Sequence, residues 1–236
     1  MSDWLTPAEW SAVGLSLKVS ATATVLSLPL GIFVAWALAR RRFIGHGLVN
    51  AAVHLPLILP PVVTGYALLL AFGRNGPAGR VLEQMFGLVL AFRWTGAVLA
   101  AAVMAFPLMV RAIRLAFEAV DPRIEAAAAT LGAPPVAVFA TVTLPLILPG
   151  VLAGAVLAFA KAMGEFGATI TFVANIPGQT QTLPTAIYAL LQSPDGDAAA
   201  LRLVAISVVI ACAAIAGSEI LARRVARRIT GREMAR

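Results

Sequence analysis

Charged side chains are scarce in this chain, and the few inside apolar sequence are the first candidates for chemistry. Lys161 and Glu165 stand four positions apart in a long apolar stretch, which places them on one face of a helix. A charge at the centre of a membrane helix costs around 3 kcal/mol on insertion scales, and it usually has a partner or a purpose. Two interpretations stay open: the pair neutralises itself on a packed face, or it lines a polar path through the membrane.

Catalytic motifs are absent from the sequence. Lys18 and Lys161 are the only lysines, and neither completes the GxxxxGK[ST] loop that binds nucleotide phosphates. His46, His54 and Cys212 belong to no metal-binding spacing, and no GxSxG elbow occurs. The sequence therefore predicts that this chain is not an enzyme, hydrolyses no ATP by itself, and holds no metal or cofactor.

The composition is that of an integral membrane protein. Hydrophobic residues make up 60% of the 236 residues, charged residues only 12%, and the mean hydropathy is +0.90, which excludes an ordinary soluble domain. The net charge of +7 comes from arginines at the ends of apolar runs, a pattern that membrane topology explains better than nucleic-acid binding. No Lys or Arg precedes Lys18, so we expect the first apolar segment to stay as a membrane helix rather than to be cleaved.

The elements that must position these residues are predicted to be five membrane-spanning helices in a single domain, 1–236. Windows of about 20 apolar residues place the spans at about 11–39, 48–72, 94–117, 146–173 and 199–222. A shorter apolar segment, 182–191 within 180–192, cannot cross a bilayer but could form a sixth helix lying at the surface. It is either a cap on the bundle or part of a docking surface. Residues 73–93 are expected to be a polar connection.

Arginines orient these spans. Twelve of them lie on one predicted side: Arg40, Arg41, Arg42, Arg111, Arg114, Arg123, Arg223, Arg224, Arg227, Arg228, Arg232 and Arg236. Only Arg74, Arg80 and Arg93 fall in the predicted connection on the other side. The positive-inside rule then predicts an outer N-terminus, a cytoplasmic loop at 118–145 and a cytoplasmic C-terminus.

The 118–145 loop contains residues that typically begin and end helices. Asp121 followed by Pro122 predicts a helix start, and Gly132 followed by prolines predicts its end. The helix between them has about ten residues and is roughly 15 Å long. Pro134 and Pro135 would then begin a second short helix that runs to about Thr143. The sequence predicts a helix, a turn and a helix between two membrane segments.

Specific residues of this loop carry a family resemblance. Glu125-Ala126-Ala127, then Gly132, then Leu144-Pro145 resemble the EAA loop of the permease subunits of binding-protein-dependent ABC importers. That resemblance implies a coupling helix seated in a cleft of a cytoplasmic ATPase. The alternative is a connecting amphipathic helix that binds no partner.

Other stretches extend the resemblance over most of the chain. The segments 16–19, 54–63 and 106–114, with Gly164-Glu165-Phe166-Gly167-Ala168-Thr169, are similar to molybdate ABC transporter permeases of the type I importer fold. The resemblance implies a homodimer in the cell inner membrane with two P-loop ATPase subunits, which bind ATP and Mg, and a periplasmic oxyanion-binding protein. It also favours the polar-path interpretation, with path residues Lys161, Gly164, Glu165, Gly167 and Thr169.

Two kinds of alternative function stay open. The same machine could carry sulfate, thiosulfate or tungstate, because the polar residues of the chain do not separate tetrahedral oxyanions. A small ATP-independent carrier is a different class, but it should have inverted repeats, and only one hexapeptide, LPLILP at 55–60 and 144–149, occurs twice.

Prolines and glycines predict where the helices bend and pack closely. Pro60-Pro61 and Pro149-Gly150 are candidate kinks, because proline frees backbone carbonyls. Gly154, Gly164 and Gly167 are expected to let helices approach closely.

Overall fold

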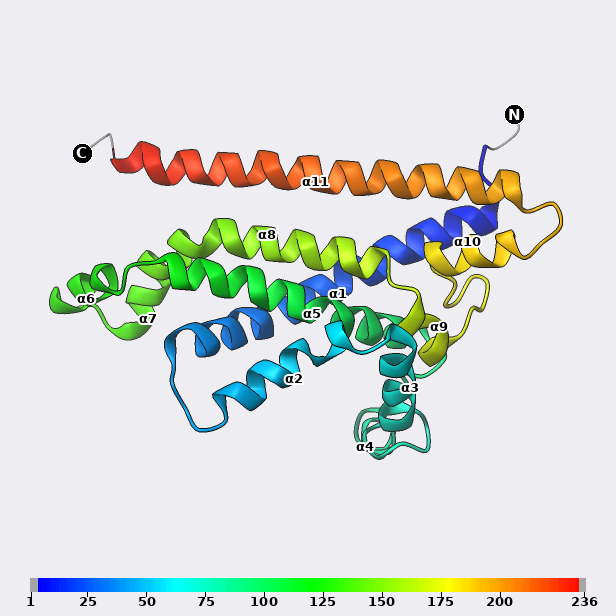
Figure 1. Cartoon of the computed structure of the whole chain (residues 1–236), viewed down its shortest axis with the longest axis horizontal. Coiled ribbons are helices and arrows are strands. Elements are labelled where there is room, and N and C mark those ends of the chain that lie inside the picture. The colour runs from blue at the N-terminus through cyan, green and yellow to red at the C-terminus, as the bar shows by residue number, and fades with distance from the viewer. Residues whose placement is uncertain (1–3, 234–236) are drawn as a thin grey trace.

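The computed structural model describes the backbone of residues 4–233 and the side chains of residues 4–217 and 220. Within these residues the chain is helical and has no strand (Figure 1). The helices are α1 (Pro7–Arg40), α2 (His46–Ile58), α3 (Pro61–Phe72), α4 (Pro77–Phe86), α5 (Trp94–Ala119), α6 (Pro122–Thr130), α7 (Pro135–Val138), the π-helix η1 (Phe139–Thr143), α8 (Leu144–Met163), α9 (Gly167–Val173), α10 (Leu183–Leu191) and α11 (Asp197–Glu233).

In the described part of the chain, four helices are long and apolar enough to cross a membrane, or up to five if a bent pair of helices counts as one span. The four are Pro7–Arg40, Trp94–Ala119, Pro135–Met163 and Asp197–Gly217. The chain is therefore a multi-pass, all-α membrane protein, as its composition predicted.

The predicted span 48–72 is divided at the two prolines that the sequence marks as a candidate kink. The chain breaks at Leu59 and Pro60, and α2 and α3 make an angle of 115°. Neither Pro60 nor Pro61 has a backbone N–H, so the helix cannot continue through them. The candidate kink at these prolines is thus a full break.

The predicted span 146–173 is also divided, at a place that the prolines did not indicate. Pro149 lies inside the continuous helix α8, whereas the break comes after Met163, before α9 begins at Gly167. Gly164, Glu165 and Phe166 make up the break, and the Glu165 carboxylate caps the start of α9. The kink expected at Pro149-Gly150 is therefore not where the helix ends.

The core forms around α5, which packs between α1 and α8 and has many small buried residues. A Cβ at Gly154 would come within 3.0 Å of the carbonyl oxygen of Met109, and one at Gly167 within 2.7 Å of Cβ of Pro61. Close packing at these two glycines is therefore confirmed. Gly164 is exposed and has room for a side chain, so the expectation for this third glycine was wrong.

Two short helices lie at the end of the bundle opposite α6 and α7 (Figure 1). The predicted helix in 180–192 is confirmed as α10. At its start the backbone N–H of Thr182 donates to Oγ1 of Thr185 at 2.8 Å, and the backbone N–H of Leu183 donates to Oγ of Ser16 at 2.6 Å. The connection 73–93 is not wholly irregular, because α4 forms within it between Pro77 and the left-handed Gly87 (φ +65°). Gly87 ends the helix because a side chain resists that conformation.

Candidate functional site

The short helix predicted between Asp121 and Gly132 is confirmed as α6. The Asp121 side chain accepts a hydrogen bond from the backbone N–H of Arg123 at 2.9 Å, and Pro122 occupies the first turn. Gly132 has φ of +84°, a conformation that other residues resist. Cap, proline and glycine therefore fix both ends of the helix.

The second half of the loop differs from the prediction of a separate short helix. α7, η1 and α8 form one uninterrupted helix, Pro135–Met163. Pro145 offers no N–H to the preceding turn, and the N–H of Leu144 bonds to the carbonyl of Phe139 in the wider π pattern. Such π turns often lie at functional sites. Leu144 packs against the core, so the Leu144-Pro145 pair lies inside the helix rather than at the end of a loop.

The Glu125 carboxylate faces the protein. Its Oε1 accepts a hydrogen bond from Thr143 Oγ1 at 2.8 Å and lies 3.5 Å from Nη2 of Arg40. Arg40 Nη2 also donates to the carbonyl of Val120 at 2.9 Å. The caps predicted that Glu125 lies in the first turn of a helix, whereas the approach of Arg40 and Thr143 requires the tertiary fold.

The other face of α6 is open. Ala126, Ala127 and Gly132 are exposed, as are Ile124 (48%) and Leu131 (89%). These side chains are small or apolar, so water is easily displaced from this narrow surface when another protein binds. Such a surface can fit a groove of another protein.

The second predicted group surrounds the break between α8 and α9. Nζ of Lys161 lies 2.9 Å from Oε2 of Glu165, and Oε1 of Glu165 accepts from the backbone N–H of Ala168 at 3.0 Å. Glu165 is thus a buried cap for α9 as well as an ion-pair partner. Gly167 and Thr169 are packed within the subunit, whereas Lys161 (side chain 30% exposed) and Gly164 reach the surface.

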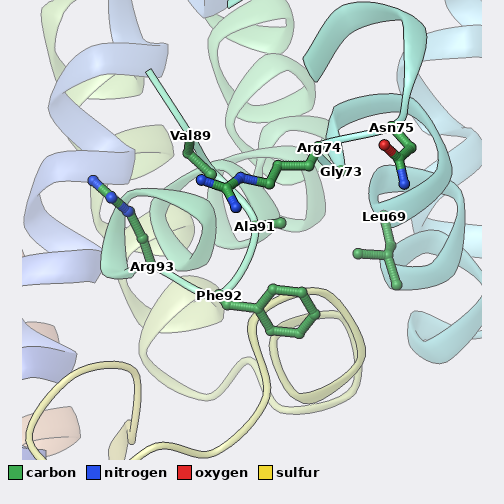
Figure 2. A pocket seen from close by; sticks show the side chains of 8 residues that line it. All are labelled: Leu69, Gly73, Arg74, Asn75, Val89, Ala91, Phe92 and Arg93. Carbon is green, nitrogen blue, oxygen red and sulfur yellow. The ribbon is translucent and has the colours of Figure 1, made fainter. Parts of the chain in front are cut away.

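The structure also places Arg74 and Arg93 around one pocket, which the sequence did not predict. A pocket of about 570 Å³ between the end of α3 and the start of α5, called here the arginine pocket, is lined by Leu69, Gly73, Arg74, Asn75, Val89, Ala91, Phe92 and Arg93. Figure 2 shows Arg74 stretched across the opening and Arg93 rising from its opposite side. Phe92 has an unusual positive φ of 59°. No sequence motif links the two segments that form this pocket.

Among the described residues no group of three or more His, Cys, Asp or Glu side chains could hold a metal ion. His46 Nε2 contacts the carbonyl of Leu38 at 3.0 Å, and His54 Nδ1 contacts the carbonyl of Asn50 at 2.8 Å. Both rings therefore have backbone partners.

The long apolar helices, joined by a short and exposed loop helix, are those of a multi-pass membrane protein. Residues 27–229 match the model of the family "Binding-protein-dependent transport system inner membrane component". The chain belongs to this family, and it is a permease of the ABC importer class and a transport component rather than an enzyme.

The molybdenum permeases among the relatives are similar over nearly their whole length. The chain is 59% identical over 219 residues to the molybdenum transport system permease protein ModB of Escherichia coli, covering 93% of this chain and 96% of that one. It is 53% identical to ModB of Haemophilus influenzae, with coverage of 94% and 96%. The sulfate transport system permease protein CysT of Salmonella typhimurium is 35% identical, with coverage of 80% and 68%.

Solved structures share the fold at low sequence identity. A bacterial ABC transporter involved in import of the polysaccharide alginate has a TM-score of 0.74 at 16% identity, covering 94% of this chain and 81% of that one. The MetNI methionine ABC transporter, in inward-facing conformations, has a TM-score of 0.68 at 16% identity, with coverage of 92% and 94%. These likenesses concern the fold alone.

Proposed function

We propose that this chain is the permease subunit of an ATP-driven importer that carries molybdate across the cell inner membrane. The observation that carries the proposal is the 59% identity to a molybdenum permease over almost the full length of both chains. A tetrahedral oxyanion as cargo requires no catalytic group in the permease itself, which agrees with the lack of catalytic motifs in the sequence.

The proposed topology has five spans in one domain, 1–236, with the bent pair α2–α3 as the second span. The N-terminus is outside, and the 118–145 loop and the C-terminus are cytoplasmic. The arginine distribution supports this orientation, since three of the arginines border the loop and others follow the first and last spans.

The proposed assembly contains a second copy of this chain, two cytoplasmic P-loop ATPase subunits that bind ATP and Mg, and a periplasmic oxyanion-binding protein, all within membrane lipid. No nucleic acid takes part. No residue of α2 is buried, and Leu48 and Ile58 are 76% and 79% exposed, so this apolar surface is free to contact lipid or the second copy. A related fold has been solved in complex with a substrate-bound periplasmic protein.

The proposed mechanism is alternating access. ATP brings the two ATPase subunits together, α6 of each permease follows its ATPase, and the membrane helices open toward the binding protein. Such a change needs a contact that differs between the two states. The exposed face of α6, with Ala126 and Ala127, supports this contact, while Glu125, Gly132, Leu144 and Pro145 set the position and shape of the loop.

The translocation path is proposed to pass near the break between α8 and α9, with Lys161, Gly164, Glu165, Gly167 and Thr169 around it. The partly exposed Lys161 supports this location. The direct pairing of Lys161 with a buried carboxylate favours the other interpretation, in which the pair neutralises itself and holds the break. Both roles are compatible with a path that runs along the exposed edge at Lys161 and Gly164.

Reconstitution tests the proposed function. The permease, its ATPase and its binding protein in proteoliposomes should take up molybdate when ATP is inside and the binding protein outside. Competition by tungstate, sulfate and thiosulfate identifies the preferred anion, and the 35% identity to a sulfate permease makes sulfate the second candidate. Uptake without ATP or binding protein would instead indicate an ATP-independent carrier.

A further inference from the structure

Arg40 joins three elements at the cytoplasmic-loop end of the bundle. It is the last residue of α1, and its Nη2 reaches both the carbonyl of Val120, just after α5, and the carboxylate of Glu125 on α6. Its side chain is only 18% exposed. The contact is therefore sheltered from water and salt more than a surface ion pair would be.

Thr143, which follows Glu125 in the sequence, contacts the same carboxylate as Arg40, which precedes it. It is the last residue of the π turn, is 3% exposed, and directly precedes α8. Its hydroxyl donates to Oε1 of Glu125 at 2.8 Å. The wider π turn sets the angular position of Thr143 relative to α8, because it adds a residue to the local helical turn.

We propose that Arg40, Glu125 and Thr143 form an internal brace that transmits the displacement of α6 to α1 and α8. The brace rests on the proposed coupling function, and it makes Arg40 and Thr143 positioning residues for transport. Besides this brace, α6 is tied to the membrane helices by the chain on either side and by its packing against α7 and η1. With the brace, a movement of α6 pulls on the end of one membrane helix and the beginning of another.

The inner and outer faces of α6 have different roles. The carboxylate of Glu125 is turned toward its own subunit, whereas Ala126, Ala127, Ile124 and Leu131 are exposed on α6 and after it. The exposed residues provide the surface for the ATPase, and Glu125 connects that surface to the membrane helices. Charge-assisted hydrogen bonds are about twice as strong as neutral ones. The bonds to the Glu125 carboxylate can therefore stay intact while α6 moves.

The test uses the complete complex of permease, ATPase and binding protein in proteoliposomes. The variants Arg40→Gln and Thr143→Val should each lower the number of molybdate ions taken up per ATP hydrolysed by about 5-fold or more, the lower end of typical coupling between sites. Arg40→Lys keeps the charge but replaces the planar guanidinium, whose Nη2 makes both contacts, with an ammonium on a shorter side chain, so its ratio should lie between those of wild type and Arg40→Gln.

Two matched controls separate coupling from folding. Arg42→Gln removes an exposed neighbouring arginine, and Thr141→Val removes an exposed hydroxyl that only bonds to the carbonyl of Ala137 in its own helix. Both should keep the wild-type ratio. The exchanged pair Arg40→Glu with Glu125→Arg should recover part of the ratio that either single reversal loses.

A wild-type ratio in both Arg40→Gln and Thr143→Val would overturn the brace. So would equal losses in the two controls. A wild-type complex that transports sulfate but not molybdate would instead contradict the proposed cargo, and the same ratios measured with sulfate would still decide the brace. Where a variant assembles poorly, the Arg40→Lys ratio decides: it supports the brace if reduced and opposes it if unchanged.

Discussion

Two arginine–glutamate pairs lie toward opposite ends of the molecule and have nearly the same separation. Arg40 and Glu125 are 3.5 Å apart with side chains 18% and 28% exposed, whereas Arg74 and Glu83 are 3.6 Å apart with side chains 72% and 40% exposed. The first pair also involves Val120 and Thr143. The second pair joins the arginine pocket to α4 and is open to water.

The difference shows that distance alone does not indicate what an ion pair does. Exposed pairs contribute about 0–1 kcal/mol, because water and salt screen them and two long side chains must be ordered. Partly buried groups with several charged hydrogen bonds contribute more, and they leave unmet donors when one member is removed. We therefore expect strong effects in the 118–145 loop and weak ones at the arginine pocket.

The pair with the most buried carboxylate should give the largest effect. Lys161→Met would leave Glu165, 3% exposed, without its cation, and breaking a buried pair costs about 3–5 kcal/mol. We expect a clear loss of thermal stability of the purified permease, measured by its unfolding temperature in detergent.

The double variant Lys161→Met with Glu165→Gln removes both charges and should recover much of that stability. If it recovers stability but not molybdate uptake, Lys161 and Glu165 serve the path. If it recovers both, the pair is only a structural neutralisation.

Glu125→Ala should have the next largest effect. Arg40 loses its carboxylate and Thr143 loses its acceptor, and hydrogen bonds to charged groups contribute about 1.5–3 kcal/mol. We expect a lower unfolding temperature together with reduced uptake in proteoliposomes. Arg123→Ala, an exposed neighbour whose backbone alone bonds to Asp121, is the control, and an equal loss there would remove the distinction between the two regions.

Gly132→Ala tests the shape of the loop rather than its charges. A Cβ there would meet nothing within 4 Å, so the cost comes only from φ of +84°. A residue other than glycine in this left-handed region costs about 1–2 kcal/mol. Gly132→Asn should cost less, because asparagine tolerates that region, and the order of the two unfolding temperatures checks the explanation.

Glu83→Gln should have the smallest effect. The exposed pair with Arg74 is screened, so we expect a change in stability below about 0.5 kcal/mol, measured by chemical or thermal unfolding. Raising the salt concentration should reduce even this difference. A loss as large as that of Glu125→Ala would break the comparison between the two pairs.

Much of the fold followed from local chemistry that the sequence displays. Asp121 with Pro122, and Gly132, are helix ends that depend on neighbouring residues, and the structure has them there. The apolar runs predicted the long helices for the same reason. The break after Met163 was missed, because glycines permit a break without requiring one and the buried capping by Glu165 depends on its surroundings.

The candidate site was predictable in part. The loop and its helix came from caps and from the resemblance, but Arg40 and Thr143 lie far from Glu125 in sequence and no spacing rule connects them. The arginine pocket was missed for the same reason, since its residues come from two segments separated by α4.

The sequence by itself determined a helical membrane protein, the ends of its loop helix and its family, because hydropathy, capping and motif residues act over a few neighbours. Only the tertiary structure decided that Glu125 faces inward to Arg40 and Thr143, and that Pro60 breaks a span while Pro149 does not. Those outcomes depend on which helices pack together, and burial gives nearly identical charge separations different strengths.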